Sequence, residues 1–484
     1  MRDRKLKVPT KLAFGVGQIA ESVQLTVFDF FLFFYYVQVL HLEPILAGTA
    51  MLLALVVDAV TDPAVGVFSD NFRSRWGRRH PFMYSSALPF GLMFYLLFSP
   101  PAAIAQMELF WWLATFAVAA RVSLTFFVVP FFAVGAELTE NYRDRTSLVA
   151  YRTMFSFLSA IAVSAIAFSV FFKVTPDYAI GQLNPEAYPL FGITFAMVVI
   201  VAILLCSFGT HKQIPHLHSV SREEGQSISF RFFVRELKEL AKNRSFLAIF
   251  LMSVTFFVVA GVQRALTLHM NTYFWALDSA EIQNLFYAFF AVTLVVIPFV
   301  KNIIDFLDKK HTMYLGLTVI LAAFVLPTIL RLLGWFPPND SAMLMPLLLA
   351  DQAIAGVGMA ILSVCSGSIV ADVADDHELR SGQRQEGMLF GFFTLAAKST
   401  SGAGQFFAGL TLWLVAFPTE KKVAPEEISS EVLFELGLIY GPVVALFGLL
   451  CIYMLSFYDI SRESHEETLK ALQENRQLSK DGGA

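Results

Sequence analysis

The chain has 484 residues, of which 56% are hydrophobic and only 15% are charged, and its formal net charge is −4. In a soluble protein of this length about a quarter of all residues are charged. The composition therefore excludes an ordinary water-soluble enzyme or binding protein. The basic residues are scattered through short loops, and nucleic acid is not an implied partner.

The apolar residues form runs of about 20 or more, which is long enough to cross a hydrocarbon core of about 30 Å. Such runs are expected to be helices, because a spanning segment must satisfy its own backbone groups. The sequence therefore predicts an all-α membrane protein with twelve transmembrane helices, at residues 13–38, 45–69, 81–100, 107–138, 148–173, 189–209, 245–273, 281–301, 312–333, 342–373, 387–416 and 433–457.

One long polar stretch separates six of these spans from the other six, as in carriers that are built from two halves. The expected organisation is an N-terminal six-helix half at 1–210, a cytoplasmic linker at 211–244, a C-terminal six-helix half at 245–458 and a cytoplasmic tail at 459–484.

The distribution of basic residues predicts the orientation, because Lys and Arg are retained on the cytoplasmic side of short loops. We expect a multi-pass protein of a bacterial-type inner membrane with both termini in the cytoplasm. The first apolar run is too long for a secretory signal peptide, so it is expected to be retained. The basic segments that lead to this prediction are 2–7, 73–79, 143–145 and 301–310.

Ionisable residues inside spans are costly and are functional candidates. In the second span, Asp58, Thr61 and Asp62 are spaced i, i+3 and i+4, which places them on one helix face. Two adjacent carboxylates with a hydroxyl suit a sodium ion or a shared proton. In the alternative interpretation, Asp62 lies at the interface and organises the basic loop near Asp70.

The second span and the loop after it carry a specific pattern. Asp58, Thr61, Asp62, Pro63 and Gly66 are followed by Ser69-Asp70 and by Arg73-Ser74-Arg75-Trp76-Gly77-Arg78-Arg79. This pattern resembles the glycoside-pentoside-hexuronide:cation symporters, and matches extend over nearly the whole chain, at Pro130-Phe131, Arg143-Asp144-Arg145, Tyr151-Arg152, Asp372, Asp375, Glu378 and Lys398. The resemblance implies the major facilitator fold and secondary active transport of a sugar-like solute by alternating access, coupled to Na⁺ or H⁺.

By this resemblance, the cation site comprises Asp58, Thr61, Asp62 and Thr125. Arg121, one turn from Thr125, departs from the family pattern, and its guanidinium could neutralise a carboxylate. The coupling ion could then be a proton, or coupling could be absent. Alternatively, Arg121 faces another part of the helix bundle.

The expected substrate-binding residues are Gln18, Glu21, Phe132, Arg152 and Lys398. The sugar-transporting members of the family carry a Lys-Asp pair where this chain has Glu21-Ser22, and a Trp where it has Phe132. Gln18 and Glu21 could instead form a contact between helices, and Arg152 and Lys398 could close a charge network. Asp29 is expected to pair with a basic residue.

The same superfamily branch includes sodium-dependent lysophospholipid carriers, which this chain also resembles at Tyr151-Arg152. The Phe-rich segment 126–132 suits an amphipathic solute, so such a carrier is the alternative function. We further expect a gating or charge network, unless these charges serve topology alone. Its residues are Asp70, Arg75, Arg78, Arg79, Arg121, Asp372, Asp375 and Arg384.

Other functional classes lack support in the sequence. An enzyme needs a nucleophile with a base, a metal cluster or a cofactor motif, and a channel usually has repeated filter segments around an oligomeric pore. We therefore expect no catalytic residues, no cofactor and no metal beyond the coupling cation. The expected partners are a small-molecule solute, the coupling cation and the lipid bilayer, and the carrier is expected to be monomeric.

Overall fold

The computed structural model describes residues 6–102, 104–139, 141–216, 240, 242–381, 386–419 and 427–481, and every regular element in these ranges is a helix. The chain falls into two compact units. Unit 1 comprises Met1–Ile228, Arg264–Gln283 and Ser401–Ser429, and unit 2 comprises Ser229–Gln263, Asn284–Thr400 and Ser430–Ala484. Most of the predicted linker at 211–244 lies outside the described residues, and the division into two six-helix halves stays a prediction.

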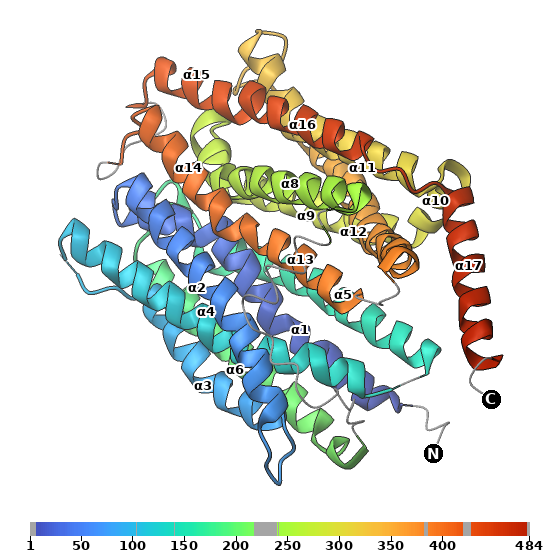
Figure 1. Cartoon of the computed structure of the whole chain (residues 1–484). Coiled ribbons are helices and arrows are strands. Elements are labelled where there is room, and N and C mark those ends of the chain that lie inside the picture. Colours follow the sequence, from blue (N-terminus) through green and yellow to red (C-terminus); the bar gives the residue numbers. More distant parts are fainter. Residues whose placement is uncertain are drawn as a thin grey trace. The chain divides into compact units, whose positions relative to one another are not determined.

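Unit 1 contains six long helices from the first part of the chain and one from near its end (Figure 1). α1 packs against α5 and α6, and α3 packs against α4 and α6. α2 packs against both α4 and α14, so side chains from all three can meet. The helices are α1 (Val8–Thr26), α2 (Pro44–Asn71), α3 (His80–Leu97), α4 (Gln106–Glu137), α5 (Tyr142–Ile166), α6 (Ala187–His211) and α14 (Ala403–Leu414).

Aromatic rings fill much of the core of unit 1. The Phe31 ring lies 5.5–5.7 Å, centroid to centroid, from the rings of Phe168, Phe172 and Phe191. Tyr188 is fully buried beside them, and its hydroxyl donates a hydrogen bond to the carbonyl oxygen of Gln182 at 2.7 Å. Aromatic pairs of this kind contribute about 0.5–1.5 kcal/mol each beyond area burial. The Phe-rich composition therefore supports packing in this unit.

Two glycines allow α2 and α14 to approach closely. A Cβ atom on Gly48 would lie 2.8 Å from the Cα atom of Phe406, and one on Gly409 would lie 2.3 Å from the carbonyl oxygen of Pro44. Small residues commonly permit such contacts between membrane helices. The close approach holds Ser401, which lies two residues before the start of α14, near α2.

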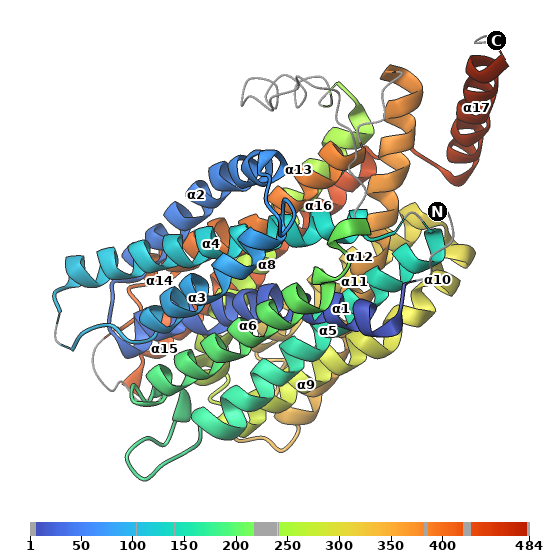
Figure 2. The same ribbon diagram turned by 90° about the horizontal axis from the view of Figure 1, so that it is seen from below.

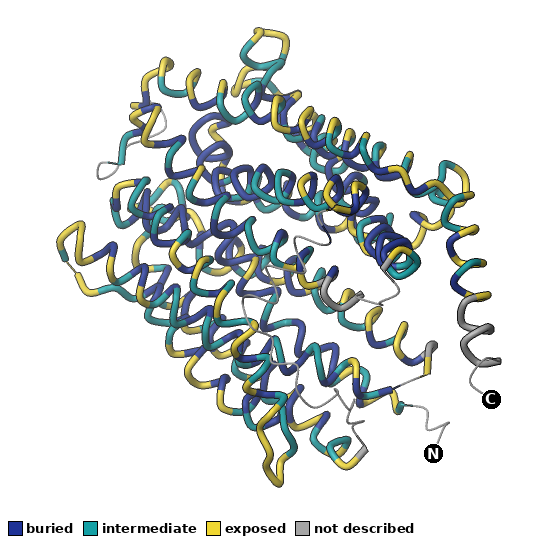
Figure 3. The backbone as a smooth tube through the Cα atoms, in the orientation of Figure 1, coloured by how far each residue is buried: buried dark blue, intermediate teal, exposed yellow. Residues whose placement is uncertain are grey.

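Unit 2 contains the remaining helices. The end of α8, from Arg264, and the start of α9, up to Gln283, belong to unit 1. Leu317, Ile361 and Cys365 lie in its buried apolar core. Figure 3 shows buried and exposed positions alternating along the helices of each unit. The helices are α8 (Arg244–His269), α9 (Ser279–Val296), α10 (Val300–Leu307), α11 (Lys309–Leu332), α12 (Leu344–Ser381), α13 (Glu386–Lys398), α15 (Ser430–Leu438), α16 (Val444–Ser456) and α17 (Arg462–Asp481).

A tight break separates α10 from α11. Asp308 adopts a positive φ of 70°, and its carboxylate accepts a hydrogen bond from the backbone N–H of Lys309 at 2.6 Å. With its ψ of 158°, Asp308 adopts a conformation that residues other than Gly rarely adopt, and its side chain caps the start of α11. The break therefore places Lys309 at the first position of α11.

Ten helical runs in the described ranges are long and apolar enough to cross a membrane, and they coincide with ten of the twelve predicted spans. The predicted span 81–100 forms α3, which has only 18 residues and contains His80, Pro81 and Pro89. The predicted span 387–416 forms two helices, α13 and α14, with the 3₁₀ turn Ser399–Ser401 and Gly402 between them. Ser and Gly disfavour a continuous helix, which accounts for the break.

Four helical runs of the described chain contain or continue into a π-helical turn, and the run that begins with α1 has two; such turns are often found at functional sites. The first of these turns, η1, carries Asp29. Figure 2 shows α17 as a separate helix beyond the end of α16. The π-helical turns are η1 (Val27–Leu32), η2 (Tyr35–Val39), η3 (Ala167–Phe171), η6 (Met270–Phe274) and η10 (Ile439–Val443).

Candidate ion and solute sites

The carboxylates of α2 lie on one helix face, as their spacing predicts. Asp58 is 3% exposed, and Asp62 follows one turn later. The hydroxyl of Thr61 donates a hydrogen bond to the backbone carbonyl of Asp58 at 3.3 Å. Pro63 lies inside α2 and has no N–H to donate to the carbonyl of Ala59, so the helix backbone is locally weakened beside the carboxylates.

Thr125 of α4 joins the two carboxylates. Its hydroxyl oxygen lies 3.0 Å from Oδ1 of Asp58 and 2.9 Å from Oδ1 of Asp62. Thr125 is 3% exposed, so water does not readily replace these contacts. The structure thus brings Asp58, Asp62 and Thr125 into one cluster, in which Asp58 and Thr125 are buried and Asp62 is half-buried. A hydroxyl has one proton to donate, so it cannot donate to both carboxylates at once.

Arg121 joins this cluster from the preceding turn of α4. Its Nη1 lies 3.5 Å from Oδ2 of Asp58, and its Nη2 donates a hydrogen bond to the hydroxyl of Ser401 at 2.6 Å. The Arg121 side chain is 5% exposed. The guanidinium thus places its positive charge beside the Asp58 carboxylate. This is the alternative in which Arg121 neutralises a carboxylate of the site. Ser401 was not predicted, and the one available signal was the polar run Ser399–Ser401 within an apolar stretch.

A second buried ion pair lies in unit 1. Arg264 Nη1 donates to Oδ2 of Asp29 at 2.9 Å, and the Asp29 side chain is 2% exposed. Asp29 thus has the basic partner that was expected of it. The pair brings together η1 and the end of α8.

The expected solute-binding residues of unit 1 come from α1, α4 and α5. Gln18 donates a hydrogen bond from Nε2 to Oε2 of Glu21 at 2.6 Å. The guanidinium carbon of Arg152 lies 4.7 Å from the ring centroid of Phe132, and Glu21 lies within electrostatic range of Arg152. Within the described residues, Oε1 of Gln18 is buried without a hydrogen-bond donor. The group combines an aromatic ring, hydrogen-bonding groups and a balanced pair of charges.

Lys398, the last of the expected solute-binding residues, is the final residue of α13 and is half-buried in unit 2. The predicted role of Lys398 in substrate binding stays a prediction.

The basic loop between α2 and α3 is tied to α2 and α4. Arg79 lies 3.0 Å from a carboxylate oxygen of Asp70 and 2.9 Å from one of Glu137, and Arg78 lies 2.9 Å from the same Glu137 oxygen. Arg75 is exposed in the loop. Glu137 was not predicted, although its position at the end of a span was a usable signal.

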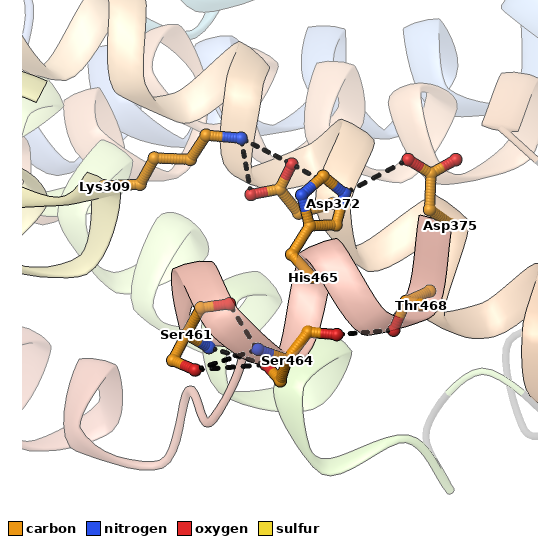
Figure 4. Close-up of polar contacts among 7 residues, drawn as sticks. All are labelled: Lys309, Asp372, Asp375, Ser461, Ser464, His465 and Thr468. Atoms are coloured by element: carbon orange, nitrogen blue, oxygen red, sulfur yellow. Dashed lines mark hydrogen bonds and ion pairs between the residues drawn. The ribbon is translucent and has the colours of Figure 1, made fainter. Parts of the chain in front are cut away.

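A second set of charges, in unit 2, lies at the start of α11, within α12 and in α17. Lys309 donates from Nζ to both carboxylate oxygens of Asp372, at 2.7 and 2.8 Å. His465 of α17 lies 3.4 Å from Asp372 and 3.3 Å from Asp375 (Figure 4). Arg384, which was also predicted for this network, lies outside the described residues. Lys309 and His465 were not predicted as partners.

Within the described residues, no group of three or more His, Cys, Asp or Glu side chains is arranged to hold a metal ion. The ion cluster of unit 1 contains two carboxylates and uncharged oxygens, which are ligands that suit a monovalent cation or a proton.

The known proteins to which this chain is similar are transporters. A family profile described as MFS/sugar transport protein matches residues 13–462. The isoprimeverose transporter of Lactiplantibacillus pentosus is 22% identical over 93% of this chain and 88% of its own length. The sodium-dependent lysophosphatidylcholine symporter 1 of Gallus gallus is 25% identical over 98% of this chain and 91% of its own. A crystal structure of a bacterial homologue of the lysosomal transporter Spinster has a TM-score of 0.63, with 12% identity, 94% of this chain covered and 98% of that one.

Proposed function

The chain belongs to the MFS/sugar transport protein family, and from this premise we propose that it is a cation-coupled symporter of a hydroxyl-rich, sugar-like solute. The family and the fold make the chain a major facilitator transporter rather than an enzyme, as the sequence predicted. The coupling ion is Na⁺ or H⁺, and it binds at Asp58, Thr61, Asp62 and Thr125.

One observation carries the proposal. Thr125 of α4 contacts both Asp58 and Asp62 of α2 through a single hydroxyl oxygen. Buried carboxylates that repel one another are costly when both are ionised, and a cation or a proton between them removes this cost. Loading the site would therefore favour the arrangement of α2 and α4 in which these three side chains are gathered. The cation would then bind more tightly to this conformation than to the other, and alternating access requires such a difference in affinity.

The proposed solute subsite of unit 1 consists of Gln18, Glu21, Arg152 and Phe132, and Lys398 of unit 2 is proposed separately as a solute-binding residue. Sugar hydroxyls need paired donors and acceptors, and a sugar ring packs on an aromatic face. The buried Oε1 of Gln18 is an acceptor for a solute hydroxyl. Because Glu21 and Arg152 offset one another in charge, the subsite suits a solute without net charge. The named substrate of the isoprimeverose transporter fits this class.

A lysophospholipid is the alternative solute. It is supported by the similarity to the sodium-dependent lysophosphatidylcholine symporter over almost the full chain. A zwitterionic headgroup would also be compatible with the Glu21 and Arg152 pair, and the acyl chain would require an aromatic or apolar path. Competition of sugars and lysolipids against one another distinguishes the two solutes.

The proposed setting is a bacterial-type inner membrane with both termini in the cytoplasm and a monomeric carrier. The set of ion pairs around Arg79 and Glu137 would then lie on the cytoplasmic side, where a basic loop is expected. Reaction of single cysteines placed in the loops with an impermeant thiol reagent tests this orientation.

The experiment that tests the function is accumulation of radiolabelled solute in proteoliposomes under imposed Na⁺ or pH gradients. We expect Asp58→Cys and Asp62→Cys to abolish concentrative uptake while the protein still inserts. Asp305→Cys, at an exposed position in α10, is the matched control and should retain uptake. Normal accumulation in either α2 variant would contradict the proposed coupling site.

A further inference from the structure

The guanidinium of Arg121 is fixed within the candidate ion site. Besides Asp58, it contacts the hydroxyl and the backbone carbonyl of Ser401, at 2.6 and 3.4 Å. The ring centroid of Phe28 lies 5.7 Å from its guanidinium carbon. These contacts come from α2, from the segment before α14 and from η1, so the side chain is held inside the unit rather than directed to water.

A guanidinium keeps its positive charge throughout the physiological pH range and cannot leave the site. Arg121 therefore supplies permanently the charge that a bound Na⁺ or Li⁺ would otherwise bring. An alkali-metal ion among the same oxygens would be repelled by this charge with little screening, because the site is buried. It would also compete with Arg121 for the Asp58 carboxylate.

A proton differs from a metal ion because it binds to one carboxylate oxygen and needs no coordination shell. The charged groups that face the site within unit 1 are Asp58 and Asp62 of α2, Arg121 of α4, and Asp29 of η1, which is itself paired with Arg264. The segment before α14 adds a hydroxyl but no charge.

We propose that Arg121 determines ion selectivity: it takes the place of an alkali-metal ion and leaves the proton as the coupling cation. The inference rests on the proposed function, because it takes the carboxylate cluster to be the coupling site. It goes beyond that function because it predicts which cations the carboxylate cluster does not bind.

The test is cation binding by the purified full-length protein, measured as the change in melting temperature when choline chloride is replaced by NaCl or LiCl at equal ionic strength. We expect no change for the wild-type protein. Arg121→Gly should gain stabilisation by Na⁺, with an apparent affinity at least about tenfold above that of wild type. Adding Asp58→Asn to Arg121→Gly should remove the gain.

Two further variants separate charge from folding. Arg121→Lys keeps a positive charge and should stay insensitive to Na⁺, and Arg121→Gln replaces the glycine variant if that variant does not fold. Stabilisation of the wild type by Na⁺, or a folded neutral variant that gains no Na⁺ response, would overturn the inference. Because no solute is present, the result is independent of uptake. Failure of every solute to accumulate would instead contradict the proposed symport.

A different observation, in unit 2, carries a second inference about the C-terminal helix. α17 begins with a reciprocal cap, in which the N–H of Ser461 donates to the Ser464 hydroxyl at 2.9 Å and the N–H of Ser464 donates to the Ser461 hydroxyl at 3.2 Å. This cap sets the start of the helix. One turn later, His465 meets Asp372 and Asp375 of α12, as Figure 4 shows.

Several charged groups lie around His465. Asp372 and Asp375 face it from α12, and Lys309 reaches Asp372 from α11. On α17 itself, Arg462 and Glu466 pair with one another at 3.4 Å. Asp376 of α12 is engaged by Arg380 at 3.0 Å and by Asn243 at 2.8 Å. Tyr458 adds no charge, because burial raises the pKa of its hydroxyl.

We infer that α17 is a pH-sensitive latch on the end of α12. An imidazole titrates near neutral pH, and a carboxylate pair binds its charged form better than its neutral form. Docking should thus be strongest when His465 carries a positive charge and should weaken as the pH rises. Only Leu472 and Thr468 of α17 are otherwise buried in its described part, so little apolar contact remains to hold it.

Thiol labelling of the full chain tests the latch. Leu472→Cys places a thiol at a position that is 6% exposed, and Lys470→Cys, at an exposed position of the same helix, corrects for the pH dependence of the reaction. The native cysteines Cys206, Cys365 and Cys451 are buried. The labelling ratio of Leu472→Cys to Lys470→Cys should rise several-fold between about pH 6 and about pH 8.

In His465→Gln the ratio should be high at both pH values. A ratio that does not change with pH in the wild-type background, or that changes equally with His465→Gln, would overturn the latch. Hydrogen exchange of α17 in the unmodified protein gives the same comparison without the Leu472 substitution, and the expected result is lower protection at the higher pH once the intrinsic base-catalysed rise in exchange rate is divided out.

Discussion

The hydroxyl oxygen of Thr125 lies 2.9 Å from a carboxylate oxygen of Asp62, although 63 positions separate the two residues in the sequence. The contact depends on the packing of α4 against α2, because each residue is buried or half-buried on the facing surface of its own helix. It converts two carboxylates on one helix into a site shared by two helices. A cation bound at this proposed site would therefore alter how these helices pack.

Thr125→Val should weaken cation coupling with little change of side-chain volume. It removes the hydroxyl that serves both carboxylates, and an unsatisfied buried group costs about 1–3 kcal/mol, or roughly tenfold to a hundredfold in apparent cation affinity. The measurement is the cation dependence of the initial uptake rate. Thr125→Ser should restore it, whereas Thr61→Val, which removes a hydroxyl that donates only to its own helix in the contacts described here, should have a smaller effect. Equal effects of the two valine variants would contradict this account.

Gly409→Val should destabilise the protein and reduce transport. Its Cβ atom would collide with the backbone carbonyl of Pro44, a group that cannot move aside without shifting α2. Overpacking of this kind costs about 1–3 kcal/mol, so the melting temperature should fall. Gly66→Ala is the control, because its Cβ atom would meet only a methyl group of Val129 at 3.7 Å. A Gly409→Val protein with unchanged stability would mean that α14 is not packed tightly against α2.

The helices themselves were largely predictable, because a membrane span must be a long apolar run with internal hydrogen bonds. The expected span 107–138 forms Gln106–Glu137, and the expected span 189–209 forms Ala187–His211. Run length does not reveal local breaks within a span, which explains the missed division at Ser399–Ser401. The sharp turn at Asp308 depends on one side chain capping the next helix, and hydropathy does not register it.

The members of the candidate ion site were predictable in part, for a geometric reason. Helical spacing alone placed Asp58 and Asp62 on one face, and the family resemblance added Thr125. The partner residues Ser401, Glu137 and His465 were missed, because periodicity identifies the face of a helix but not the helix that packs against it. The contact of Arg121 with Asp58 was one of two alternatives, and only the packing of α2 with α4 distinguished them.

Glu137→Gln should loosen the basic loop between α2 and α3. The variant removes the charge that both Arg78 and Arg79 contact, and Arg79 would keep only Asp70 of these two partners. Hydrogen bonds to charged groups contribute about 1.5–3 kcal/mol, so we expect faster tryptic cleavage in the loop and a lower uptake rate. Arg75→Gln, at an exposed position, should retain uptake. If Glu137→Gln left both cleavage and uptake unchanged, the ion pairs would serve topology alone.

Asp29→Asn should destabilise unit 1 more than the paired variant Asp29→Asn with Arg264→Gln. The single change leaves Arg264 without the carboxylate that it contacts at 2.9 Å, whereas the double change removes both charges. Loss of one partner of a buried pair can cost about 3–5 kcal/mol, and the partial exposure of Arg264 should reduce this to about 1–3 kcal/mol. The melting temperatures of the two single variants, the double variant and the wild type form a double-mutant cycle. A coupling energy near zero would show that Asp29 and Arg264 are stabilised independently, whereas a clearly favourable one would identify the pair as the contact that fixes η1 against α8.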